Sequence, residues 1–410
     1  MNQEEQELTE NITELIKLTV VTNEPPQTRD FPHVLYLPHK KEFHILQKNG
    51  DFYQLKSKIP LRKILDRYKV NFTEEFLDTE ILRFAFECRK NNTQDIVKAI
   101  SQWITNLTNM TKDKFTFFMP INHFDYKKDL DLGAVKVIKL NQEKLIELFP
   151  EFSKKLDPLI SLDEQISTNN TNVFAIITVE TLEKSFAEEL AKNYLGRFIH
   201  AVRLIDPYSF ATDRYNEKLP VNVNTWVFDH HTGNIGANHR SINLPARITP
   251  SNEFYNKLEP YWDILRSFLY AEKTTPLQSL ILSSIFWFGS VHGHFDDNLS
   301  SFIKYMIGLE RLLILDDERQ GKKELFAKRF ATIFVSNDNK EHYQFYYEQM
   351  KEYYELRNIT FHQLDQIIYP EIVTTLRIRL RFLLLTFIMQ STKYNNIRDL
   401  LKNEYEIDLD

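Results

Sequence analysis

The strongest constraint on the fold is a change of pattern after Pro250. From there to the end of the chain, helical patterns follow one another and strand patterns almost vanish. The Thr275-Pro276 pair predicts a helix start, with threonine as the N-cap and proline as the first helical residue. The predicted helices cover residues 253–270, 276–289, 299–315, 324–334, 341–364, 372–390 and 395–404. Consecutive helices bury their apolar faces most simply in an antiparallel bundle, so we predict an all-α C-terminal domain.

The first 250 residues mix helical and strand patterns. The fully apolar run at 173–179 and the alternating run at 132–140 predict strands, and 182–205 predicts a long amphipathic helix. The Asn49-Gly50 pair predicts a β-hairpin turn. Other expected strands are 33–37, 44–47 and 114–121, and other expected helical regions are 1–18 and 73–107.

The predicted fold class is therefore α+β, with a mixed α/β N-terminal region followed by an all-α bundle. We expect an N-terminal region at 1–250, which has room for two subdomains. A connecting helix at 251–275 then leads to the bundle at 276–410.

Composition excludes several classes of protein. The net charge of -6 argues against a nonspecific nucleic-acid binder. Cys88 is the only cysteine, so no intramolecular disulfide forms, and a cytoplasmic location is expected. The N-terminus lacks the pattern of a signal peptide, and the apolar runs at 277–289 and 382–389 are too short to span a bilayer. The sequence also contains no Walker A loop, Rossmann glycine pattern, HExxH or G-x-S-x-G.

The six residues Arg357–His362 (RNITFH) carry the clearest chemistry. Arginine binds phosphate through charge-assisted hydrogen bonds, and histidine transfers protons near neutral pH. His362 is the candidate base or acid, Arg357 stabilises a phosphorane, and Asn358 orients the phosphate or His362. On a helix Arg357 and His362 lie roughly 140° apart, so two copies of the helix meeting at one groove form a better site. The alternative is that Arg357 pairs with a neighbouring glutamate and His362 is a surface residue.

Glu310 is a candidate partner for Arg357. On its own helix it lies on the flank of the apolar face, roughly 40° from Met306. A carboxylate there is costly unless it is paired, and we predict that it orients Arg357. The alternative is a glutamate at the edge of the apolar stripe with no role in a site.

The motif resembles the R-x4–6-H signature of the HEPN superfamily. The upstream segment 302–313 (FIKYMIGLERLL) looks like the Leu-Glu helix of the Apea-like HEPN group, and 324–334 (ELFAKRFATIF) resembles its next element. The resemblance covers about residues 270–405. Many members place glycine after the motif histidine, whereas this chain has Gln363.

The resemblance implies a helical bundle that acts as a metal-independent endoribonuclease without a cofactor. Arg357, Asn358, His362 and Glu310 would form the site, RNA would be the substrate, and a homodimer would complete it. Such proteins resemble prokaryotic antiviral-defence or abortive-infection effectors. The N-terminal region would then sense a trigger or bind a partner protein. The alternative is a non-catalytic bundle that binds RNA or a protein.

Other groups of residues offer weaker alternatives. Two histidine clusters, at 229–231 with His239 downstream and at 292–297, invite metal binding, but both look like loops, and Asp297 suits a helix N-cap. The arginines at 377, 379 and 381 suit either phosphate contacts or a solvated helix surface. The aromatic residues between 343 and 354 suit either core and interface packing or base stacking.

Overall fold

The computed structural model divides the chain into two compact units. It describes residues 2–22, 33–37, 42–47, 49–70, 72–121, 129–150, 173–205, 222–229, 235–241, 252–291, 297–335, 339–362 and 367–407. Unit 1 contains Met1–Phe115, Val179–Leu190 and Asp229–Gly233. Unit 2 contains Thr116–Thr178, Ala191–Phe228 and Asn234–Asp410. Each unit is therefore built from separate stretches of the chain.

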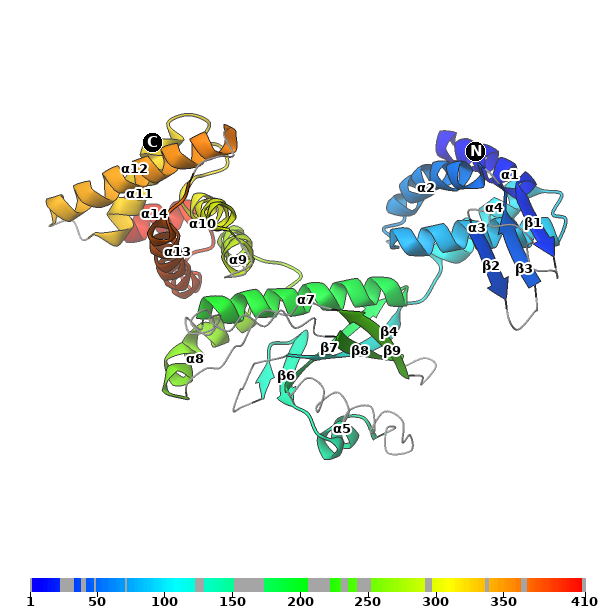
Figure 1. Cartoon of the computed structure of the whole chain (residues 1–410), viewed down its shortest axis with the longest axis horizontal. Coiled ribbons are helices and arrows are strands. Elements are labelled where there is room, and N and C mark those ends of the chain that lie inside the picture. The colour runs from blue at the N-terminus through cyan, green and yellow to red at the C-terminus, as the bar shows by residue number, and fades with distance from the viewer. Residues whose placement is uncertain are drawn as a thin grey trace. The chain divides into compact units, whose positions relative to one another are not determined.

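The elements are labelled as in Figure 1. The strands are β1 (Thr19–Thr22), β2 (His33–Leu37), β3 (Glu42–Leu46), β4 (Asp113–Pro120), β5 (Leu130–Asp131), β6 (Val135–Lys139), β7 (Val173–Thr181), β8 (Asn222–Asp229) and β9 (Ile235–Ser241). The helices up to residue 266 are α1 (Gln3–Lys17), α2 (Gly50–Arg67), α3 (Glu74–Lys90), α4 (Ile96–Thr108), α5 (Gln142–Leu148), α7 (Lys184–Ile205) and α8 (Asn252–Arg266). The remaining helices are α9 (Pro276–Gly289), α10 (Asn298–Leu313), α11 (Lys322–Phe334), α12 (Lys340–His362), α13 (Pro370–Gln390) and α14 (Ile397–Tyr405).

Unit 1 combines α1–α4 with a small antiparallel sheet of strand order β1-β3-β2. Its core is formed by apolar faces of the four helices, with buried residues that include Leu8, Ile12, Leu61, Ile81 and Trp103. The alternation of apolar and polar positions around each helix buries one face of each against the others.

The predicted hairpin turn at Asn49-Gly50 is wrong. Asn49 has a φ of 71°, as a hairpin turn requires, but the chain continues into α2 at Gly50. A Cβ atom at Gly50 would lie 2.3 Å from Leu46 Cγ, so glycine is needed for the close approach to β3.

The expected helical region at 73–107 is two helices. Thr73 begins α3, because its hydroxyl accepts from Phe76 N–H at 3.1 Å. Asn92 has a φ of 47° in the turn that follows, and Asp95 begins α4 by accepting from Lys98 N–H at 2.9 Å. The two helices thus form a hairpin.

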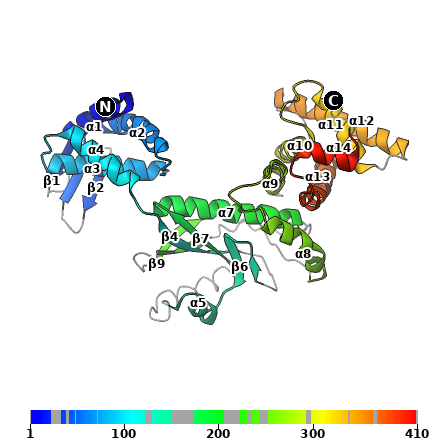
Figure 2. The same ribbon diagram turned by 180° about the vertical axis from the view of Figure 1, so that it is seen from behind.

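Unit 2 contains a six-stranded sheet of order β5-β6-β7-β4-β8-β9. The pairs β6–β7 and β8–β9 are antiparallel, with Val137 opposite Ala175 and Trp226 opposite Ala237. The α7 helix runs along one side of this sheet (Figures 1 and 2), and buried residues such as Phe198 and Val202 lie on its second half. Unit 2 therefore joins a sheet layer to a helical layer.

The helices α9–α14 form the bundle of unit 2. Buried residues such as Tyr305, Leu309 and Leu380 fill its interior. A Cβ atom at Gly308 would lie 2.7 Å from Leu380 Cδ2, so α10 and α13 pack closely there. The predicted N-cap at Thr275 is confirmed, with a reciprocal hydrogen bond to Gln278.

The bundle is fastened to the end of α7 by two arginines. Arg381 of α13 donates to the carbonyl oxygens of Leu204 and Ile205, each at 2.8 Å. Arg203 donates to the carbonyl of Gly289 at the end of α9. Because the last carbonyls of a helix lack partners within the helix, Arg381 satisfies groups that need a donor.

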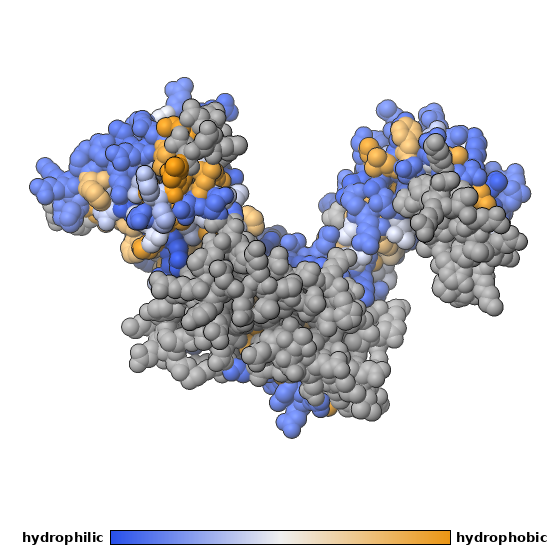
Figure 3. Space-filling view, in the orientation of Figure 1, coloured by the Kyte–Doolittle hydropathy of each residue, from blue (hydrophilic) through white to orange (hydrophobic). Residues whose placement is uncertain are grey.

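The predicted α+β class with a helix-rich C-terminal region is confirmed. The expected division at 250–275 stays a prediction, while the compact units follow a different, discontinuous division. None of the helices in the described residues is long and apolar enough to cross a membrane. On the face shown in Figure 3, the coloured residues are mostly hydrophilic, with scattered apolar patches.

Candidate active site

The motif lies on the last two turns of α12, beside α10 and α11. The α10 helix begins at Asp297, whose carboxylate accepts from Ser300 N–H at 2.6 Å, so the predicted N-cap is confirmed. The α11 helix follows Gly321, which has a φ of 65°. Local signals in the sequence therefore set the start of the two helices that support α12.

Arg357 and Glu310 form an ion pair. Nη2 of Arg357 lies 2.9 Å from Oε2 of Glu310, and both side chains are about one-fifth exposed, at 23% and 20%. The predicted pairing is confirmed. A pair in this partly buried setting is stronger than one at the surface, because less water screens it.

Tyr354 completes the environment of Glu310. Its hydroxyl donates to Glu310 Oε1 at 3.1 Å, while its ring lies 5.6 Å from the Arg357 guanidinium carbon. Burial, followed by the nearby Glu310 charge, raises the pKa of Tyr354 to about 12. The phenol therefore stays protonated and keeps donating at neutral pH.

Asn358 lies on the exposed side of α12. Its Oδ1 accepts from Arg357 Nη1 at 3.0 Å, so the amide and Glu310 hold the guanidinium from two directions. An exposed amide beside a partly exposed guanidinium offers a phosphate two kinds of donor.

His362 is the last residue of α12, and its side chain lies outside the described residues. Helical geometry puts its position roughly 40° from Asn358 and roughly 140° from Arg357 around the axis. The backbone thus groups His362 with the exposed Asn358 position rather than with the inward Arg357 position. The shared site between two copies stays a prediction.

A buried ion pair holds the end of α10, which carries Glu310. Arg329 of α11 is 1% exposed and pairs with Glu318. Its Nη1 also donates to the carbonyl of Leu313 at 2.7 Å, and Glu318 Oε2 accepts from Leu315 N–H at 2.8 Å. The last turn of α10 and the residues after it are therefore fixed to α11.

Sequence reasoning missed Tyr354, Arg329 and Glu318 as supports of the site. Tyr354 had a local signal, because it precedes Arg357 by three residues and such pairs share a helix face. Arg329 and Glu318 had none, since their pairing depends on how the connection between α10 and α11 turns.

Arg379 and Arg381 of α13 have contacts that neither interpretation of the sequence predicted. Arg379 is buried, with its guanidinium 4.9 Å from the Tyr346 ring and bonded to Gln349, so it fastens α13 to α12. Arg381 binds the end of α7. Neither of these two side chains belongs to a solvated helix surface.

The aromatic residues of α12 mostly pack within the bundle. Tyr354 lies 5.4 Å from Phe326, and Tyr346 lies 6.0 Å from Phe334. Phe345 is an exception, with 57% of its surface exposed.

The histidine clusters lie outside what the structure describes. Residues 230–231 and 292–296 are not described, and neither is the side chain of His239. Within the described ranges, no group of three or more histidine, cysteine, aspartate or glutamate residues is arranged to hold a metal ion.

The chain was compared with protein-family models, curated proteins and solved structures. No protein-family model, curated protein or solved structure matches the chain. The functional argument therefore depends on the residues themselves and on the motif resemblance.

Proposed function

We propose that this protein is a metal-independent endoribonuclease of the HEPN type. The observation that carries the proposal is the held guanidinium of Arg357. Glu310 and Asn358 bind it, Tyr354 supports Glu310, and the side chain still has 23% of its surface exposed. A cation that is fixed in place and still reachable suits the stabilisation of a phosphorane.

In the proposed reaction His362 removes the proton from a ribose 2′-hydroxyl. The 2′-oxygen attacks the adjacent phosphorus, and the bond from phosphorus to the 5′-oxygen breaks. The leaving 5′-oxygen takes up a proton from an acid such as a second His362, so the products are a 2′,3′-cyclic phosphate and a 5′-hydroxyl. Arg357 and Asn358 bind the phosphate oxygens throughout.

A homodimer would bring two motifs together. Its support is helical geometry, which groups position 362 of α12 with the exposed Asn358 rather than with Arg357. Ile359, within the motif, is 44% exposed, and an apolar residue there suits contact with a second copy.

The proposed biological setting is antiviral defence or abortive infection in a prokaryotic cytoplasm. This part rests on the Apea-like resemblance and on the presence of a separate N-terminal unit that could bind a trigger or partner.

The central test is RNA cleavage by the purified protein in EDTA. We expect wild type to release cyclic-phosphate ends, and His362→Ala and Arg357→Ala to lose at least about 100-fold in rate. His342→Ala and Arg311→Ala are matched controls, because both residues are exposed on the same bundle. Equal activity in wild type and both site variants would contradict the proposal, as would cleavage only with added divalent metal.

A second function is favoured by the same ion pair. Glu310 and Asn358 already accept hydrogen bonds from Arg357 within one chain, and the Tyr354 ring lies against its guanidinium, as a purely structural arginine requires. In that case the bundle binds RNA or a protein without cleaving it. RNA retained by both wild type and His362→Ala in a binding assay, with no cleavage by either, would favour this function.

A further inference from the structure

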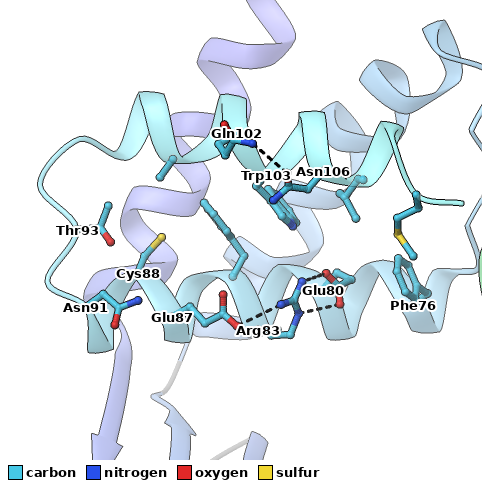
Figure 4. A pocket seen from close by; sticks show the side chains of 14 residues that line it. Phe76, Glu80, Arg83, Glu87, Cys88, Asn91, Thr93, Gln102, Trp103 and Asn106 are labelled. Carbon is cyan, nitrogen blue, oxygen red and sulfur yellow. Dashed lines mark hydrogen bonds and ion pairs between the residues drawn. The ribbon is translucent and has the colours of Figure 1, made fainter. Parts of the chain in front are cut away.

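A groove between α3 and α4 in unit 1 has the size of a small-molecule site. Its volume is about 450 Å³, which lies within the usual range for ligand pockets. Figure 4 shows Trp103 and Asn106 on the side of α4 toward Glu80 and Arg83 of α3, with Gln102 bonded to Asn106. The groove is separate from the α12 site and belongs to a different unit.

The base of the groove is aromatic. Phe84 and Trp103 stack with ring centroids 4.4 Å apart and planes 8° from parallel. Both are buried, and Leu107 lies beside them in the lining. The small part of these two rings that the groove reaches is apolar, which favours the ring of a flat aromatic ligand.

Trp103 has an unused hydrogen-bond donor. Its Nε1 is buried and has no hydrogen-bond partner among the described residues. An indole N–H can only donate, so the group that satisfies it must be an acceptor, such as a ring nitrogen or carbonyl oxygen.

The rim supplies polar groups of a particular kind. On α3, Arg83 binds Glu80 and also Glu87, whose side chain is 52% exposed. On α4, Gln102 donates to Asn106 at 3.0 Å, and both residues are exposed. Two carboxylates flank a single guanidinium, so the rim repels anions and accepts hydrogen bonds from amino groups.

We propose that unit 1 binds a nucleoside-type ligand in this groove. The ligand is an amino-substituted heteroaromatic ring without a phosphate. Its ring packs on the Phe84–Trp103 base, a ring acceptor takes the Trp103 N–H, and its amino group donates to the rim of Glu87, Gln102 and Asn106.

The test is direct binding to the full-length protein, measured by saturation-transfer NMR and by calorimetry. The probes are adenosine, guanosine, cytidine and uridine, each compared with its 5′-monophosphate. We expect at least one of the amino-substituted nucleosides, which are adenosine, guanosine and cytidine, to bind with a dissociation constant of about 0.1 mM. Its monophosphate should bind at least about tenfold more weakly, because the acidic rim repels it.

Three variants separate the proposal from nonspecific binding. Trp103→Phe keeps an aromatic ring but removes the donor, and should weaken binding about tenfold. Ala99→Phe fills the groove and should abolish binding. Trp262→Phe is the matched control, because Trp262 is also buried with an unpartnered Nε1 but does not line the groove.

Several results would overturn the proposal. They are no binding of any nucleoside to wild type, wild-type affinity in Ala99→Phe, and equal affinity for nucleoside and monophosphate. If Trp103→Phe melts early by circular dichroism, Gln102→Ala at the exposed rim takes its place, and unchanged affinity there also counts against the proposal. The readout is binding alone, so it is independent of RNA cleavage.

Discussion

At Glu310 the two carboxylate oxygens bind different groups. Oε2 accepts from Arg357, and Oε1 accepts from the Tyr354 hydroxyl. This arrangement fixes the carboxylate, so the guanidinium has one preferred position. An arginine whose guanidinium is already held in one position loses less conformational entropy when it binds a phosphate.

Removing the charge of Glu310 should weaken that control. Glu310→Gln keeps an acceptor for Tyr354 but loses the ion pair, so we expect the cleavage rate in EDTA to fall about 10- to 100-fold. The matched control is Glu324→Gln on α11, an exposed glutamate near Lys323. A wild-type rate in Glu310→Gln would show that Glu310 does not position Arg357.

Tyr354 should make stability depend on alkaline pH. Its pKa in the folded protein is raised to about 12, by burial first and then by Glu310. The folded state therefore holds this proton more tightly than the unfolded state, and stability falls as pH rises from about 10 through 12. Tyr354→Phe should lose less of its melting temperature than wild type between pH 9 and about 11.5. The same loss in both proteins would contradict the assignment.

Among the elements, the end of α10 depends on Arg329. This guanidinium is 1% exposed and joins Glu318 to the carbonyl of Leu313. Removal of Arg329 leaves the Glu318 carboxylate, only 16% exposed, without its cation and the Leu313 carbonyl without its donor, which is the costly case.

We therefore expect Arg329→Ala to lower the free energy of unfolding by about 3–5 kcal/mol. Arg398→Ala should lower it by less than about 1 kcal/mol, because Arg398 pairs with the neighbouring Asp317 at an exposed site, with 50% and 68% of the side chains exposed. Urea unfolding of both variants checks this contrast, and equal losses would contradict it.

A buried glutamate that contacts the start of α3 predicts how the stability of the protein changes between pH 4 and pH 7. Glu183 accepts from Thr73 N–H at 2.5 Å, its Oε2 has no hydrogen-bond partner in the described chain, and burial raises its pKa. The folded state thus binds the proton more tightly, and stability is lost as pH rises from the ordinary value through the raised one. Glu183→Gln cannot ionise, so its melting temperature relative to wild type should be higher at pH 7 than at pH 4.

The control for that experiment is Glu143→Gln, an exposed glutamate in the first turn of α5. The difference between pH 4 and pH 7 in melting temperature relative to wild type should be larger for Glu183→Gln than for this control. If Glu183→Gln also shows no difference between pH 4 and pH 7, the carboxyl does not titrate with folding.

Elements with a local signal could be predicted from the sequence, and others could not. Thr275, Pro276 and Gln278 together specify the start of α9 without help from the rest of the fold. Asn49-Gly50 misled, because a left-handed asparagine suits a hairpin as well as the start of α2. Glycine is needed there because Leu46 approaches closely, and no local sequence pattern reveals that contact.

The candidate site divides in the same way. The pairing of Glu310 with Arg357 could be predicted, since a carboxylate on an apolar flank requires a cation. The role of Tyr354 could not be predicted, because it depends on how α10 and α12 pack. The role of His362 is still argued only from its position in the motif.

At the scale of the whole molecule, the compact units are assembled from separate stretches. Unit 1 takes in residues 179–190, the end of β7 and the first turns of α7, which are distant in sequence from its main part at 1–115. A reading of composition along the chain favours continuous domains, so it cannot predict this exchange of segments.

The proposed homodimer predicts complementation between inactive copies. A mixture of Arg357→Ala and His362→Ala proteins contains mixed dimers in which one chain supplies the arginine and the other the histidine. We expect the mixture to cleave RNA in EDTA faster than either protein alone. A rate equal to the average of the two would contradict a site shared between chains.

Cys88 has a practical consequence for all of these experiments. It is the only cysteine in the chain, it is 5% exposed, and burial raises the pKa of its thiol. Thiolate is the reactive form, so this thiol reacts slowly with alkylating dyes. A cysteine introduced at an exposed position outside the candidate site, such as Glu324, would therefore take a fluorophore selectively, without prior removal of a native cysteine. Cys88 itself lines the groove of unit 1, so a ligand bound in the proposed nucleoside site should slow the alkylation of Cys88 further.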